Sequence, residues 1–168
     1  ELVTPAELRA DLGVGTDAQA DVLPLLSTQL AVVQDVLALQ GDSRTYMVGA
    51  EYCFDRAVSP DVVERAVRLC VQQHAALRTR IRLSDVPWAD FAYQLVDADA
   101  HVAIDVLDLR EQHLSADQVA EQVGEWCYGP FDLFGDHLVE FRLVWWAQDR
   151  LTLVCRAHGV IMDADSLS

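Results

Sequence analysis

Residues 138–157 read LVEFRLVWWAQDRLTLVCRA, and this stretch decides the fold. It contains two apolar runs, residues 138–146 and 151–157, in which Val, Leu, Phe and Trp dominate. Runs of this length and composition are typical of buried strands. The residues Gln148, Asp149 and Arg150 lie between the runs and suit a tight turn. The pattern therefore predicts a hairpin of two antiparallel strands.

Strands and helices alternate in the sequence before this hairpin. Apolar residues recur at helical spacing over residues 25–41. Ser59-Pro60-Asp61 is typical of a helix start, and Ser115 with Gln118 has the pattern of a capping box. We expect helices at residues 25–41, 59–76 and 115–129, strands at residues 46–54, 77–83, 91–96 and 102–107, and the beginning of a further helix from residue 163. This order predicts an α/β (α+β) layer sandwich.

The beginning of the chain differs in composition from the rest. Residues 1–22 are polar and rich in alanine, and Gly13 and Gly15 interrupt any long helix. We expect a linker here, with a short helix after Pro5, followed by one domain at residues 23–168.

Composition excludes several classes of function. The chain has 168 residues, of which 52% are hydrophobic, and its formal net charge is −15. An excess of acid of this size argues against binding to nucleic acid or to an anionic membrane surface. The four cysteines form no CxxC pair, and Cys53, Cys70 and Cys155 lie in apolar runs, where we expect them to be core residues. We therefore expect neither a metal site nor a directly bound cofactor, and a cytoplasmic location.

The segment RAHGVIMDADS at residues 156–166 carries the candidate chemistry. His158 ends the last predicted strand, where a rigidly held imidazole could exchange protons near neutral pH. Asp163 follows in the turn after the strand, and Ser166 lies three residues after Asp163. The alternative is that His158 only completes the strand and that Asp163 caps the next helix. Ser166 has no base nearby and no glycine elbow, which argues against a serine hydrolase.

Four stretches, in order, resemble motifs of the condensation superfamily of nonribosomal peptide synthetases. Residues 158–164 (HGVIMDA) resemble its His-His-x-x-x-Asp-Gly motif. The other three are residues 23–29 (LPLLSTQ), which resemble Leu-Pro-Leu-Ser-x-x-Gln; residues 73–79 (QHAALRT), which resemble Arg-His-Glu-x-Leu-Arg-Thr; and residues 130–138 (PFDLFGDHL), which resemble Phe-Asp-Leu-x-x-Gly-Pro-Leu. The resemblance covers residues 23–168.

The resemblance implies one lobe of a domain related to chloramphenicol acetyltransferase. Members of the family have two such lobes with an active-site tunnel between them, and this chain is similar to the N-terminal lobe. Asp163 matches a structural aspartate, which the family pairs with the arginine at Arg78. His158 matches the first motif histidine, but Gly159 stands where the family has its second histidine. The heterocyclising branch instead carries Asp-x-x-x-x-Asp-x-x-Ser, to which His158, Asp163 and Ser166 align.

The resemblance also implies the parent activity and the partners. Family members form peptide bonds between substrates carried on phosphopantetheine, so the implied partners are peptidyl or aminoacyl carrier proteins. A C-terminal lobe or neighbouring synthetase domains would complete the site. Because Gly159 has no side chain to move a proton, we expect this chain to be inactive alone. A docking or dimerisation element without catalysis is the alternative, and a free-standing acyltransferase that receives its other lobe in trans is a third.

Three arginines alternate along the strand predicted at residues 77–83. Arg78, Arg80 and Arg82 share one face, since successive strand residues point to opposite sides. They could form a charged wall that meets an acidic carrier or a phosphopantetheine phosphate. Alternatively, Arg78 pairs internally and the other two arginines are solvated.

Overall fold

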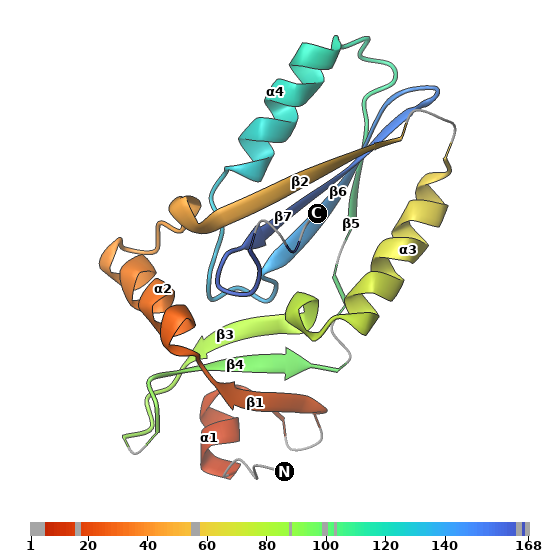
Figure 1. Cartoon of the computed structure of the whole chain (residues 1–168). Coiled ribbons are helices and arrows are strands. Elements are labelled where there is room, and N and C mark those ends of the chain that lie inside the picture. The colour runs from red at the N-terminus through yellow and green to blue at the C-terminus, as the bar shows by residue number, and fades with distance from the viewer. Residues whose placement is uncertain are drawn as a thin grey trace.

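The computed structural model describes residues 6–15, 18–54, 58–87, 89–98, 101–102, 104–163 and 166 (Figure 1). Helices and strands follow one another as α1 (Ala6–Asp11), β1 (Ala20–Pro24), α2 (Ser27–Ala38), β2 (Met47–Phe54), α3 (Pro60–Gln73), β3 (Thr79–Leu83), β4 (Ala92–Asp97), β5 (Ile104–Asp108), α4 (Ala116–Cys127), β6 (Val139–Ala147) and β7 (Arg150–His158). Two short 3-10 turns, Arg44–Tyr46 and Ala75–Arg78, precede β2 and β3. The predicted mixed α/β layer architecture is confirmed.

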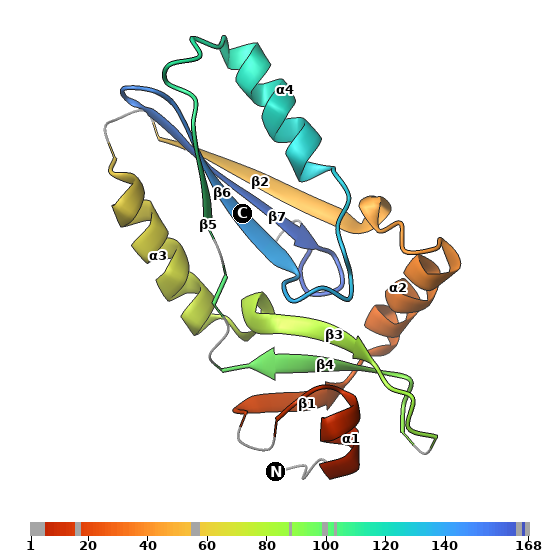
Figure 2. The same cartoon turned by 180° about the vertical axis from the view of Figure 1, so that it is seen from behind.

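The hairpin predicted at residues 138–157 forms the centre of the larger sheet. This sheet has the strand order β2-β7-β6-β5, in which β7 pairs antiparallel with both β2 and β6. Helix α3 packs on one face through Val63, Val67 and Val71. Helix α4 packs on the opposite face, where Val119 and Val123 meet Val144 and Val154 (Figure 2). The sheet carries a helix on each face, which explains why its central strands place apolar residues on both faces.

The second sheet has three strands in the order β1-β4-β3. Helix α1 packs against it: Leu8, Leu12 and Val14 are buried with Tyr93 and Leu95 of β4. The short helix after Pro5 is therefore present. Leu12 and Val14, which follow α1, are buried on the sheet, and strand β1 begins at Ala20, so these described residues of the expected linker pack into the fold. These apolar residues are too few for the sequence to show the period of a helix or of a strand.

Several local expectations change in detail. The Ser115–Gln118 capping box is formed, but the Ser59 side chain makes no capping hydrogen bond at α3. The segment predicted as a strand from residue 77 first makes a 3-10 turn and becomes strand β3 only at residue 79. The helix expected after Asp163 falls largely outside the described residues.

The cysteines do not follow the expectation in full. Cys155 is buried as expected, but Cys53 and Cys70 are exposed, and Cys127 is buried instead. Cys53 lies on the edge strand β2, and Cys70 lies on the part of α3 that faces an open groove. An apolar sequence context therefore did not suffice to place a thiol in the core. No disulfide joins any of the four.

The packing of α1 predicts a loss of stability when Leu8 is truncated. Leu8 is 4% exposed, so Leu8→Ala removes buried methyl groups and should lower the free energy of unfolding by about 2–4 kcal/mol. The exposed neighbour Glu7 offers the control, since Glu7→Ala should change stability by less than about 0.5 kcal/mol. Urea unfolding followed by circular dichroism measures both. Equal, small effects would mean that residues 6–15 behave as a linker after all.

Candidate functional site

His158 is the last residue of β7 and is fully buried. Its Nδ1 accepts a hydrogen bond from the backbone N–H of Val160 at 3.1 Å. Its ring stacks on Tyr46, with 6.0 Å between centroids, and lies 6.3 Å from the ring of Phe131. Nε2 is also buried and has no hydrogen-bond partner. Since Nδ1 is the acceptor, the proton of a neutral ring sits on Nε2 and points into the protein.

Burial also determines the charge of this histidine. It lowers the pKa of His158 from 6.5 to about 4, because the charged ring would lose its hydration. His158 is therefore neutral at pH 7. A general base must reach the proton that it removes, and neither nitrogen of His158 reaches solvent. This geometry is that of a residue that completes the strand and anchors the turn after it.

Gly159 occupies the exposed position beside this histidine. Its backbone N–H donates to the carbonyl of Tyr46 at 2.7 Å, and this bond ties the end of β7 to the start of β2. A Cβ added at Gly159 would lie 3.0 Å from the same carbonyl oxygen. The motif therefore presents no titratable side chain to solvent at residues 158 and 159.

Asp163 and Ser166 are held to each other. The Oδ1 atom of Asp163 accepts hydrogen bonds from the backbone N–H of Ser166, at 2.9 Å, and from the Ser166 hydroxyl. These two bonds stabilise the carboxylate and lower the pKa of Asp163. An aspartate that accepts from a residue three positions later is typical of a helix cap. The contact therefore agrees with the alternative in which Asp163 caps the segment that follows it.

The expected ion pair between Arg78 and Asp163 is not formed among the described residues. Instead, Arg78 donates through Nε to the Val71 carbonyl at 3.2 Å and through Nη1 to the Asp97 carbonyl. These bonds join the end of α3 to the end of β4. Asp163 meanwhile uses the same oxygen for both bonds to Ser166. The motif aspartate therefore has the local partner that the capping alternative implies, whereas the backbone partners of the motif arginine are not evident from sequence spacing.

Arg82, at the other end of β3, holds the loop before β6. It donates through Nη1 to the carbonyls of Phe134 and Gly135 at 2.6 and 3.0 Å, and it pairs with Asp136 at 2.8 Å. The stretch at residues 130–138 is thereby fixed to the smaller sheet. Arg78 and Arg82 therefore both donate to groups within the protein. For Arg78 this is the alternative to a charged wall, whereas Arg82 was expected to be solvated in that alternative.

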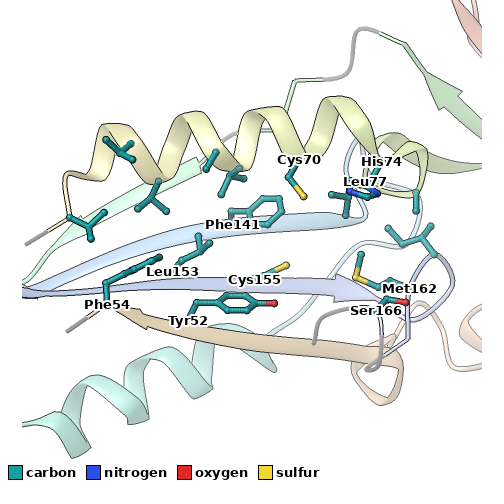
Figure 3. A pocket seen from close by; sticks show the side chains of 17 residues that line it. Tyr52, Phe54, Cys70, His74, Leu77, Phe141, Leu153, Cys155, Met162 and Ser166 are labelled. Atoms are coloured by element: carbon teal, nitrogen blue, oxygen red, sulfur yellow. The ribbon is translucent and has the colours of Figure 1, made fainter. Parts of the chain in front are cut away.

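An apolar groove of about 710 Å³ lies between α3 and the larger sheet (Figure 3). The side chains of Tyr52, Phe54, Leu153 and Cys155 form its floor, and α3 forms one wall. The polar groups at one end belong to His74 and Ser166. The sequence analysis did not identify this groove. One sequence signal does point to it. The apolar face of α3 includes Val62, Ala66 and Cys70 in addition to the buried Val63, Val67 and Val71, so it is wider than contact with the sheet alone requires.

Two further classes of site are not supported by the described residues. None of their His, Cys, Asp and Glu side chains form a group of three or more that could hold a metal ion. None of the described helices has the length and apolar character needed to cross a bilayer.

Comparisons with known proteins give a consistent result. The family model of the condensation domain matches residues 19–168. The starter condensation domain of rhizomide synthetase RzmA is 23% identical, with a TM-score of 0.74 over 86% of this chain and 35% of that one. A mutant of that domain in a "product-released" conformation is 21% identical, with a TM-score of 0.75 over 94% of this chain and 33% of that one.

A larger assembly shows the same likeness. The four-domain nonribosomal peptide synthetase AB3403, bound to AMP and glycine, is 19% identical, with a TM-score of 0.71 over 86% of this chain and 11% of that one. The chain thus spans about a third of the starter condensation domain structures that it matches. No curated protein matches it.

The buried His158 predicts a specific dependence of stability on pH. Between pH 6.5 and about 4, the imidazole of residue 158 binds a proton in the unfolded chain but not in the folded state. The free energy of unfolding therefore falls as the pH falls through this range. The expected loss between about pH 7.5 and pH 5.0 is about 2 kcal/mol. His158→Asn keeps an acceptor for the Val160 N–H but does not titrate, so this variant should lose less. Urea unfolding at both pH values measures the difference.

The matched control replaces an exposed histidine. His113 has a positive φ of 52°, which asparagine tolerates, so His113→Asn should keep the pH dependence of the parent chain. The same loss of stability in the parent and in His158→Asn would contradict the assignment of this dependence to His158.

The close approach at Gly159 predicts a cost for any side chain there. Gly159→Ala places a methyl group 3.0 Å from the Tyr46 carbonyl oxygen and should lower the free energy of unfolding by about 1–2 kcal/mol. Nothing lies within 4 Å of a Cβ built at Gly15, so Gly15→Ala should be neutral or slightly stabilising. Thermal unfolding of the two variants distinguishes these outcomes, and equal melting temperatures would show that the turn yields without cost.

Proposed function

The chain belongs to the condensation domain family, and on this premise we propose that it is the N-terminal lobe of a domain that joins substrates held on carrier proteins. The observation that carries the proposal is the match of the family model over residues 19–168 together with the lobe-like fold. The activity, the carrier-protein partners and the phosphopantetheine-bound substrates belong to the proposal. So do the cytoplasmic location and the second lobe that would complete the tunnel.

We propose further that this lobe is inactive alone. Amide formation on a thioester requires that the attacking amine lose a proton to a group within hydrogen-bond reach. At residue 158 the imidazole is buried and neutral, and at residue 159 there is no side chain. Neither residue 158 nor residue 159 can therefore take this proton directly.

The heterocyclising branch is a second proposal for the type of domain. It is supported by the spacing of His158, Asp163 and Ser166 and by the hydrogen bonds that hold Ser166 on Asp163. Ser166 also lines the end of the apolar groove, which puts its hydroxyl beside space that a ligand could fill.

A docking or dimerisation element is the alternative to catalysis. Two observations favour it: the motif presents no exposed base at residues 158 and 159, and β2 is an edge strand of the larger sheet over eight residues. An open edge offers backbone groups to a further strand. A free-standing acyltransferase would instead require the other lobe in trans.

An assay with loaded donor and acceptor carrier proteins tests the proposed function. The chain alone should form no product, and neither should Gly159→His, because the second lobe is absent in both. Addition of a C-terminal lobe in trans should allow product formation only with Gly159→His. The variant Gly15→His is the control for a histidine placed elsewhere.

The outcomes separate the alternatives. Product from the unmodified chain alone would overturn the proposal of inactivity. If Gly159→His folds and binds the second lobe but forms no product, a missing base is not the reason for inactivity. Binding of a carrier without turnover would then favour the docking element, and a dimer found by solution mass would favour dimerisation.

A further inference from the structure

A small polar pocket of about 180 Å³ lies at the junction of β3, the end of β4 and the loop before β6. It is separate in character from the apolar groove, since most of its lining is charged or polar. The side chains that line it are Leu77, Arg78, Thr79, Arg80, Asp97, His101, Asp136 and His137.

Arg80 is the unusual residue of this pocket. Its Nε–H is buried and has no hydrogen-bond partner. Its Nη2 lies 3.7 Å from a carboxylate oxygen of Asp97, and its Nη1 lies 3.9 Å from one of Asp136. Both distances exceed those of a hydrogen bond. A buried cationic donor without an acceptor is unfavourable, and in native proteins a bound water or ion commonly satisfies such a group.

The charge balance of the pocket favours an anion. Asp136 pairs closely with Arg82, whose guanidinium reaches it at 2.8 Å from outside the pocket. Arg78 donates to two backbone carbonyls and has no carboxylate within ion-pair distance among the described residues. Among the described residues, three guanidinium groups therefore face two carboxylates, which leaves a local positive charge in a chain of net charge −15.

We propose that this pocket binds a phosphate group through Arg78 and Arg80. The planar guanidinium offers paired N–H donors that match the oxygens of phosphate. His101 and His137 line the same pocket and can supply further N–H donors. The volume suits one phosphate group and little else. The ligand is either inorganic phosphate or the phosphate of a larger molecule such as pantetheine 4′-phosphate, and the site does not depend on the proposed function.

Titration of the chain with inorganic phosphate tests the site. At constant ionic strength, calorimetry should show saturable binding with a Kd of about 1 mM. In ¹⁵N-labelled protein the Nε–H signal of Arg80 should shift in proportion to occupancy. No saturation up to about 20 mM phosphate would overturn the proposal.

Two variants change the affinity in opposite directions. Arg80→Gln removes a central donor and should weaken phosphate binding about tenfold or more. Asp136→Asn removes a competing carboxylate and should tighten binding, a result that misfolding cannot produce. Arg68→Gln removes the same charge from the exposed surface of α3 and should leave the Kd unchanged. Equal weakening of phosphate binding by Arg80→Gln and by Arg68→Gln would mean that the phosphate is attracted only by general charge, and would overturn the proposal.

The source of the phosphate is decided by a parallel titration. Pantetheine 4′-phosphate that binds at least as tightly as inorganic phosphate, and shifts the same Arg80 signal, would identify a site that admits the larger molecule. Tight binding of inorganic phosphate alone would identify a site for the free ion. Failure of the condensation assay would leave both results unaffected, because neither titration involves catalysis.

Discussion

The pairing of β7 on both of its sides is the constraint on which the rest of the structure depends. β7 lies between β2 and β6, so its backbone is engaged along its whole length. The same pairing continues past its end: the His158 N–H donates to the Leu138 carbonyl at 2.9 Å, and the Gly159 N–H donates to Tyr46. The motif therefore begins at a point fixed by two neighbouring strands. The position of its side chains follows from the sheet and leaves little freedom to adjust.

The second constraint is a set of three arginines at the junction of the two sheets, Arg78 in the 3-10 turn before β3 and Arg80 and Arg82 on β3. Arg82 holds the loop before β6, and Arg78 holds the end of α3 to β4. Arg78 donates to two backbone carbonyls and keeps further N–H donors, whereas Arg82 donates to backbone carbonyls and also pairs with Asp136. Arg80, between them, reaches neither a carbonyl nor a close carboxylate. The three arginines share one face and one sequence pattern, but the loop and the helix end provide acceptors for only two of them.

Much of the fold could be predicted because local patterns and tertiary packing agree along the larger sheet. The hairpin at β6 and β7 and the Ser115 cap of α4 are local features, and both are present. The start of the chain was predicted incorrectly because Leu8, Leu12 and Val14 acquire their role only when β4 lies beneath them. The candidate site was harder still. Nothing in the spacing of Arg78 and Asp163 shows that each has a nearer partner, since those partners are backbone atoms and a serine three residues away.

The geometry at His158 explains why this turn uses a side chain at residue 158 and none at residue 159. The imidazole fills the space between Tyr46 and Phe131, and its Nδ1 is the acceptor that the Val160 N–H requires inside the protein. An aliphatic residue would fill the space but leave that N–H unpaired, so the imidazole is needed for the turn regardless of catalysis. Residue 159 contributes only its backbone to the same turn. The proposed absence of a proton-accepting side chain at residue 159 is therefore compatible with an intact turn.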